Sequence, residues 1–114
     1  MIAVLSVSHV VRLKAVAGVE MIGFIAGEQR VPEKLAWIAT LGVLPDYRRQ
    51  GIASALLSTC EAQLTMPRIR LTVRAENLAA QQLYQNFGYY KVGYWPDYYN
   101  GGGNALVFEK NNRA

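Results

Sequence analysis

The first part of the chain shows hydrophobic patterns typical of β-strands. The segment 10–18, VVRLKAVAG, begins with β-branched residues and then alternates, and the segment 20–30 also fits a strand. Gly18 supplies a turn between them, so these two strands are expected to form a hairpin. The segment 35–44, LAWIATLGVL, is almost entirely apolar, which is typical of a strand covered on both faces. Pro45 ends this strand.

Helical spacing replaces the strand pattern in the segment 51–65. Its apolar face consists of Ala53, Leu56, Leu57, Cys60 and Leu64. The segment 68–75 then alternates charged and apolar residues and predicts a strand. A second helix is expected to begin at Asn77, a good N-cap, and to end at Gly88, a good C-cap.

Two further strands, 89–95 and 105–110, complete the predicted order: three strands, helix, strand, helix and two strands. The unit that joins 35–44 to 68–75 through a helix requires a crossover, and hence a parallel pair. The other neighbouring strands form antiparallel hairpins. The sequence therefore predicts a single α/β domain with a mixed sheet over residues 1–114.

Composition narrows the class of protein. Apolar residues make up 52% and charged residues 18% of the 114 residues, as in globular domains. No apolar run approaches the roughly 20 residues that cross a bilayer, so no membrane partner is predicted. Cys60 is the single cysteine, which excludes an intrachain disulfide and favours a reduced, cytoplasmic setting. No metal ligands are predicted.

The net charge of +4 favours an anionic partner. The tight basic cluster, Arg48 and Arg49, stands in the stretch DYRRQGIA before the first helix. A helix N-terminus binds anions through its free N–H groups, and Gly51 lets a phosphate approach the backbone. The stretch lacks the lysine and hydroxyl residue of a nucleotide-triphosphate loop. A nucleic-acid-binding domain is a rival interpretation, but no long basic stripe supports it.

Two motifs carry a family resemblance. The stretch RRQGIA resembles the acyl-coenzyme A signature of the GNAT superfamily, the Gcn5-related N-acetyltransferases, with matches at Arg48, Gly51 and Ala53. The stretch VRAENLAAQQLYQNFGY is similar to the second superfamily motif, with Asn77 and Tyr84 at the expected spacing. The resemblance implies a GNAT fold and an acetyltransferase that uses acetyl-CoA.

The resemblance also implies roles for particular residues. The expected coenzyme A contacts are the backbone of Leu41 and Val43, the loop residues Arg48, Arg49, Gln50, Gly51, Ile52 and Ala53, and Asn77, Ala80 and Tyr84. An N–H of the strand near Val43 would stabilise the oxyanion, and Tyr84 would protonate the leaving thiolate. The pantetheine arm would lie between two diverging parallel strands.

The tail YYNGGGNALVFEK resembles that of ribosomal-protein and N-terminal protein acetyltransferases. The resemblance places Tyr98 and Tyr99 at the entry of a peptide N-terminus. A protein or peptide α-amine is therefore the expected acceptor. A small-molecule amine acetyltransferase and a coenzyme A-binding module without catalysis are the alternatives.

The sequence departs from the family pattern in two ways. Thr72 and Trp37 stand where relatives carry a general base or a tyrosine, and a threonine cannot accept a proton near neutral pH. The chain also starts at about the family's second strand, without the usual first strand and helices. Apolar residues near the N-terminus are Val4, Leu5, Val7, Val10, Val11 and Leu13. They are expected to form an exposed apolar patch, and hence a homodimer whose contact involves residues before about Gly18 and helps to close the acceptor site.

Overall fold

The computed structural model describes residues 1–4 and 9–112 and confirms an α/β architecture. The strands are β1 (Ile2–Val4), β2 (Val10–Ala17), β3 (Glu20–Arg30), β4 (Leu35–Val43), β5 (Arg68–Arg74), β6 (Tyr90–Trp95) and β7 (Ala105–Asn111). The helices are α1 (Ile52–Gln63) and α2 (Leu78–Asn86), with short 3₁₀ turns at Val31–Glu33 and Pro45–Tyr47. The predicted elements are all present, with bounds shifted by at most a few residues.

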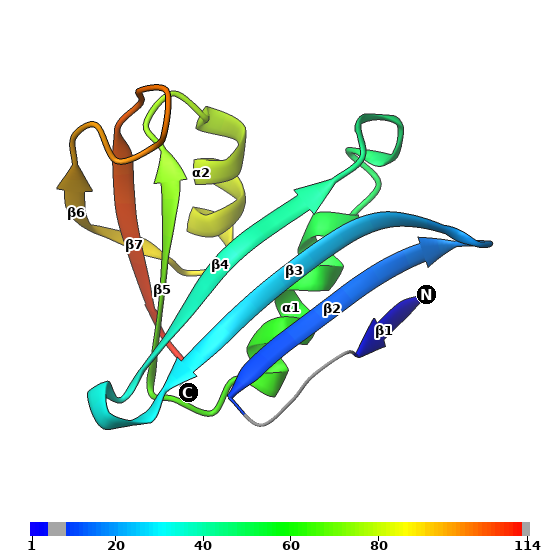
Figure 1. Cartoon of the computed structure of the whole chain (residues 1–114), viewed down its shortest axis with the longest axis horizontal. Coiled ribbons are helices and arrows are strands. Elements are labelled where there is room, and N and C mark those ends of the chain that lie inside the picture. Colours follow the sequence, from blue (N-terminus) through cyan, green and yellow to red (C-terminus); the bar gives the residue numbers. More distant parts are fainter. Residues whose placement is uncertain (5–8, 113–114) are drawn as a thin grey trace.

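The strands form one sheet in the order β1-β2-β3-β4-β5-β7-β6 (Figure 1). The pair β4–β5 is parallel, and α1 lies in the connection between these two strands. The other neighbouring strands are antiparallel. This is the predicted mixed sheet, with a parallel strand–helix–strand unit and antiparallel hairpins on both sides of it.

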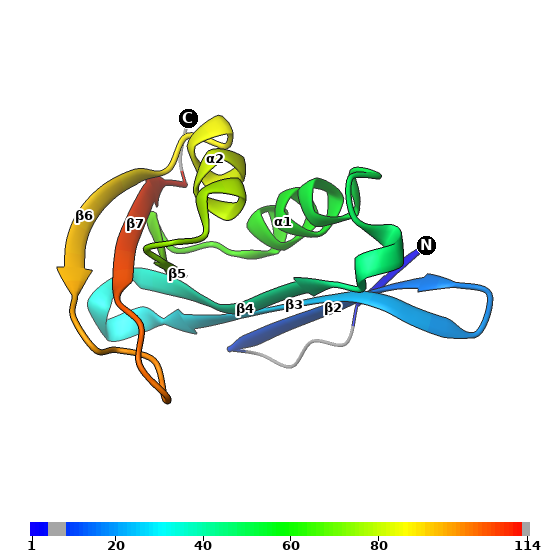
Figure 2. The ribbon, with the colours of Figure 1, turned by 90° about the horizontal axis from the view of Figure 1, so that it is seen from above.

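Both helices lie on the same face of the sheet (Figure 2). Helix α1 approaches β3 closely because β3 presents glycines to it. A Cβ at Gly23 would lie 3.0 Å from a methyl group of Leu56, and one at Gly27 would lie 3.4 Å from the sulfur of Cys60. Leu56 and Cys60 are fully buried, and burial is the main reason why the pKa of the Cys60 thiol is raised to about 12. Cys60 is thus a core thiol.

A charged cluster ties β7 to its neighbours. Glu109 in β7 is only 6% exposed. Its carboxylate accepts a hydrogen bond of 2.7 Å from Arg70 Nε in β5 and one of 3.1 Å from the Tyr90 hydroxyl in β6. Arg68 adds a second ion pair at 3.7 Å. These partners stabilise the buried carboxylate in its charged form.

The N-terminal region differs from the prediction in two respects. The structure adds β1, which pairs with β2 at the edge of the sheet. Val11 and Leu13 were expected to form an exposed apolar patch, and that is wrong. They are 5% and 0% exposed, because the inward face of β2 belongs to the core cluster beneath α1. Leu5 and Val7 lie outside the described residues.

Candidate active site

The site begins where the two parallel strands separate. β4 and β5 pair only from Leu35 with Arg68 to Ile38 with Leu71. Beyond these residues β4 remains paired with β3 as far as Val43, and β5 remains paired with β7. The register between β3 and β4 shifts beside Ala39, which is a β-bulge on the strand that faces the gap. The predicted divergence of two parallel strands is therefore present.

The backbone of β4 beyond the bulge offers hydrogen-bonding groups to this gap. The Leu44 N–H donates to the Ile22 carbonyl at 2.8 Å, toward β3. In an antiparallel ladder these groups point alternately toward the partner strand and away from it. The backbone groups of Val43 and Leu41 consequently point away from β3, into the gap.

The loop between β4 and α1 forms an open helix N-terminus. Gly51 is the N-cap residue of α1 with φ of 79°, and Arg49 also has a positive φ, 63°. No side chain of the described residues caps the first turn of α1, and a Cβ at Gly51 would meet nothing within 4 Å. The start of α1 is therefore uncapped by side chains of the described residues, and free first-turn N–H groups together with the helix dipole favour anions at such a terminus.

Two side chains of this loop, Arg48 and Gln50, donate hydrogen bonds to backbone carbonyls that precede them in the sequence. Arg48 Nε donates to the Val43 carbonyl at 3.2 Å, and Gln50 Nε2 donates to the Asp46 carbonyl at 3.2 Å. The first bond holds the loop to the end of β4, and the second lies within the loop. Arg48 thereby carries its positive charge to the end of the gap.

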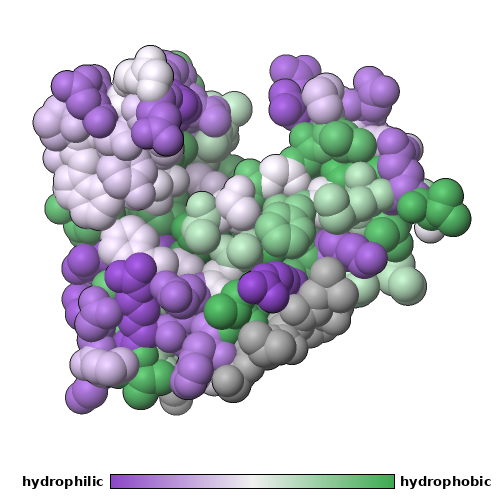
Figure 3. Space-filling view, viewed as in Figure 1, coloured by the Kyte–Doolittle hydropathy of each residue, from purple (hydrophilic) through white to green (hydrophobic). Residues whose placement is uncertain are grey.

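A cleft of about 370 Å³ follows the gap between β4 and β5. Its lining consists of Ile38, Ala39, Thr40, Leu41, Leu71, Thr72, Val73, Arg74, Asn77, Ala80, Tyr84 and Tyr99. Figure 3 shows a hollow in the surface. On one side of it lie α2 and β5–β7, and on the other side lie the end of β4 and the loop before α1. The cleft thus brings together residues that are far apart in the sequence.

Five of the residues predicted for the site line this cleft: Leu41, Asn77, Ala80, Tyr84 and Tyr99. Val43 and the loop residues Arg48, Arg49, Gln50, Gly51, Ile52 and Ala53 lie beyond it, at the end of β4 and the start of α1. Tyr98 is 49% exposed and also lies outside the lining. The predicted site residues therefore fall into two groups, one along the gap and one at the start of α1.

Tyr84 presents a protonated hydroxyl to the cleft. Its side chain is 7% exposed, and its ring packs edge-on against Tyr89 and Phe108 at centroid distances of 5.8 and 6.4 Å. Burial, and secondarily the neighbouring Tyr99, raise the pKa of Tyr84 to about 12. Tyr84 therefore keeps its proton throughout the neutral range, which a proton donor requires.

Asn77 fixes the start of α2. Its side-chain oxygen accepts a hydrogen bond of 3.1 Å from the Ala80 N–H, which confirms the predicted N-cap. Gly88 has φ of 95° just after the helix, as expected for a C-terminal glycine. The caps set where α2 starts and ends, and Tyr84 lies near its C-terminal end.

A carboxylate or imidazole base is missing from the cleft wall. Thr72 occupies the middle of β5 and lines the cleft, but the lining residues include no Asp, Glu or His. Trp37 packs against Trp95 of β6 at 6.0 Å, and its indole N–H is buried without a hydrogen-bond partner. Among residues 1–4 and 9–112, no three His, Cys, Asp or Glu side chains lie close enough to hold a metal ion.

Sequence reasoning missed one feature of the site. Arg74 lines the cleft from the end of β5. It lies two residues after Thr72, so strand alternation places both side chains on the same face. That spacing could have indicated Arg74.

This fold and site define a family. The chain belongs to the acetyltransferase (GNAT) family, whose sequence model matches residues 6–89. The chain is also 37% identical over 71 residues to N-alpha-acetyltransferase 50 from Danio rerio, a match that covers 59% of this chain and 42% of that protein. It spans about half or less of the length of the curated relatives it matches.

Solved structures share the fold. The ribosomal-protein-S18-alanine N-acetyltransferase from Escherichia coli superposes with a TM-score of 0.82 and 24% identity, over 96% of this chain and 73% of that chain. The Arabidopsis thaliana NAA60 structure in complex with acetyl-CoA superposes with a TM-score of 0.77 and 24% identity, over 91% and 77% of the two chains. In the described part of this chain, neither α-helix is long and apolar enough to cross a membrane.

Proposed function

We propose that this chain transfers the acetyl group of acetyl-CoA to the α-amine of a protein or peptide N-terminus. The observation that carries the proposal is the cleft between β4 and β5, which is lined by Tyr84 and Tyr99, while β4 continues beyond it to the loop that starts α1. One end of this arrangement suits the phosphates of the donor, and the other suits a reacting thioester. Membership of the acetyltransferase family supports the same reaction.

The acetyl donor, acetyl-CoA, would be held by residues that follow one another from the start of α1 along β4 to the cleft. The N–H groups of Arg49, Gln50, Gly51, Ile52 and Ala53 would bind the pyrophosphate, with the charge of Arg48 nearby. The backbone of Leu41 and Val43 would bind the pantetheine arm as an added strand would. Asn77, Ala80 and Tyr84 would flank it on the α2 side. No metal is needed in this arrangement.

The proposed reaction is a direct transfer. The amine nitrogen attacks the thioester carbonyl carbon, and the oxyanion is stabilised by an N–H on the gap side of β4. Val43 is the predicted donor of that hydrogen bond, and Leu41 presents an N–H to the same gap beside Tyr84. The carbon–sulfur bond then breaks, the sulfur takes the proton of Tyr84, and the nitrogen releases a proton to water. The Tyr84 phenolate regains a proton from water, which completes the cycle.

The lack of a base on the cleft wall favours an α-amine as the acceptor. Thr72 cannot take the proton of an ammonium group, so the amine must reach the cleft in neutral form. An α-amine has a pKa of about 8 and a lysine one of about 10.4, so the α-amine is neutral far more often at neutral pH. Tyr98 and Tyr99 would line its entry. The similarity to N-alpha-acetyltransferase 50 agrees with this acceptor class.

The test is an acetylation assay with a panel of acceptors. The chain is incubated with acetyl-CoA and either unblocked peptides or polyamines, and thiol release is followed together with product mass. The proposal predicts transfer to peptides. Transfer only to polyamines would favour the small-molecule alternative. Binding of acetyl-CoA without transfer to either would favour the binding module, an alternative supported by the missing base.

A cytoplasmic location and a homodimer are further proposals. The location is supported by the single cysteine. Val11 and Leu13 lie in the core, so they do not support the dimer. It is supported by the outer edge of β1, which pairs with no strand of the described residues. Strands β2 and β3 separate that edge from β4. A contact there would not reach the cleft directly. Sedimentation at micromolar concentration tests it: a dimer supports the proposal, and a monomer contradicts it.

A further inference from the structure

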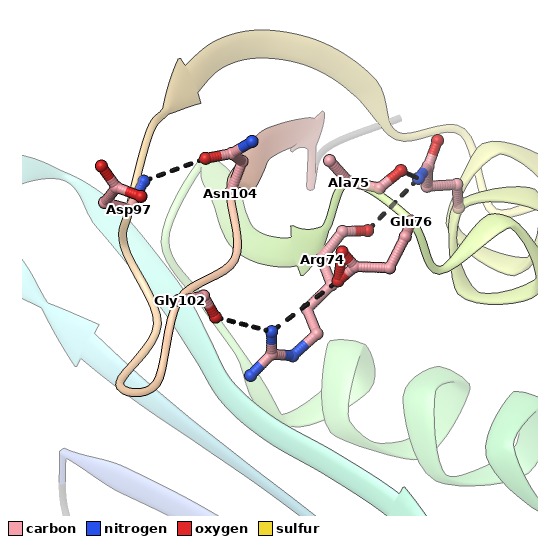
Figure 4. Close-up of polar contacts among 7 residues, drawn as sticks. Arg74, Ala75, Glu76, Asp97, Gly102 and Asn104 are labelled. Atoms are coloured by element: carbon pink, nitrogen blue, oxygen red, sulfur yellow. Dashed lines mark hydrogen bonds and ion pairs between the residues drawn. The ribbon is translucent and has the colours of Figure 1, made fainter.

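The end of β5 contacts the loop between β6 and β7, residues 96–104, through the side chain of Arg74 and through the Ala75 N–H, which donates to the Asn104 carbonyl at 2.9 Å. Arg74 Nη1 donates to the Gly102 carbonyl at 3.3 Å (Figure 4). The guanidinium also lies 4.2 Å from the centre of the Tyr99 ring. Its ion pair with Glu76 is longer, at 3.7 Å. Arg74 therefore contacts the loop by a hydrogen bond and by a cation–π interaction at once.

The loop has a shape that fits around this guanidinium. The Tyr99 N–H donates to the Gly103 carbonyl and the Gly102 N–H to the Tyr99 carbonyl, at 3.3 and 3.0 Å. Gly103 has φ of 118°, and a Cβ there would overlap Arg74 Nη1. The glycine at 103 is thus required both by its backbone conformation and by the room that Arg74 occupies.

The loop carries aromatic rings from β6 to the cleft. Trp95 packs on Tyr98 at 5.2 Å and Tyr98 on Tyr99 at 5.0 Å, and Tyr99 lines the cleft together with Tyr84. A shift of the loop would therefore move the wall against which an acceptor lies. The side-chain contacts of Arg74 with Gly102, Tyr99 and Glu76 involve no residue of β4 or α1.

We propose that Arg74 is a positioning residue that holds the 96–104 loop in the conformation required for acceptor binding. It does so through its contacts with Tyr99 and Gly102. The role rests on the proposed acetyl transfer, because that reaction is what gives the loop an acceptor to bind. Arg74 itself is assigned no part in the bond-making steps.

Hydrogen exchange followed by mass spectrometry tests the positioning without any substrate. In Arg74→Ala, the amides of 98–104 are expected to exchange about tenfold faster than in the wild type, because two loop contacts are lost. Glu76→Gln is the matched control, since it removes the longer ion pair and leaves the loop contacts in place. Gly103→Ala, which displaces the guanidinium from the loop side, should accelerate the same amides.

Steady-state kinetics test the consequence for the acceptor. Arg74→Ala is expected to raise the acceptor KM about tenfold and to leave the KM for acetyl-CoA and the melting temperature unchanged. Arg74→Lys should restore little, because a lysine does not reproduce the planar contact with Tyr99. If the loop amides of Arg74→Ala exchange at the wild-type rate, the proposal is overturned. Faster exchange with an unaltered acceptor KM overturns it as well. A wild-type chain that acetylates no amine counts against the proposed function instead, while the exchange data still decide the positioning.

Discussion

Gly51 allows a sharp test of the phosphate-binding terminus, because the chain contains a matched glycine elsewhere. Gly51 and Gly18 have φ of 79° and 61°, and a Cβ at either position would meet no atom within 4 Å. Alanine at either position therefore costs the same kind of backbone strain. Gly18 lies in the turn between β2 and β3, so only the substitution at Gly51 puts a methyl group where a phosphate would lie.

The expected magnitudes follow from the size of the chain. A left-handed non-glycine residue costs about 1–2 kcal/mol. For a domain of this length each kcal/mol lowers the melting temperature by about 4 °C, so both alanine variants should melt about 4–8 °C below the wild type. Acetyl-CoA at about 100 times its Kd should stabilise the wild type by about 2.7 kcal/mol, or about 11 °C.

The difference between the variants appears when acetyl-CoA is added. Gly18→Ala should keep the full shift of about 11 °C, whereas a tenfold weaker affinity in Gly51→Ala would reduce it to about 6 °C, and Gly51→Val should abolish it. Differential scanning fluorimetry with and without acetyl-CoA measures all three, and calorimetry gives the affinities. Equal ligand shifts in the two alanine variants would refute the assignment of the phosphate site to the start of α1.

Three further predictions concern titratable groups. Tyr84→Phe should lower the rate by about 10²–10⁴-fold with little change in the affinity for acetyl-CoA, and an unaltered rate where chemistry is limiting would remove Tyr84 from the mechanism. Because Tyr84 has a pKa of about 12, the rate should rise through the amine pKa near 8 and then stay level; a fall centred near pH 9 would contradict its role as the acid. Burial raises the pKa of Glu109, but hydrogen bonds from Arg70 and Tyr90 outweigh this and leave it below its usual value. The stability that ionised Glu109 contributes to the fold is then complete above about pH 4.3 and is lost as the pH falls through the lowered pKa. Glu109→Gln should therefore cost about 1–3 kcal/mol of stability at neutral pH and make stability depend less on pH in acid. An unchanged dependence of stability on pH would contradict this.

The local features of this protein could be predicted from its sequence. Apolar runs, alternation and glycines gave the strands from β2 onward and both helices, and the cap at Asn77 lies where its side chain predicts. The loop from Arg48 to Ala53 was found because its chemistry is contiguous in the sequence. Short-range physics controls such features, so a short window contains the required information.

The remaining features depend on contacts between distant segments. The burial of Val11 and Leu13 depends on where α1 crosses β2, and alternation alone does not show which face is covered. Strand β1 is three residues long, too short for a periodic pattern. The contact of Arg74 with Gly102 arises from strand register and from a loop 28 residues away. These are properties of the assembled sheet.

The central claim is acetyl transfer to an α-amine, and one peptide tests it directly. The peptide carries a free N-terminus and an internal lysine, and is incubated with the chain and acetyl-CoA at neutral pH. Fragmentation mass spectrometry then locates the acetyl group. The account predicts acetylation of the α-amine, because the cleft wall provides no base for the lysine ammonium. Acetylation of the lysine alone, or of neither amine while acetyl-CoA still binds, would contradict it.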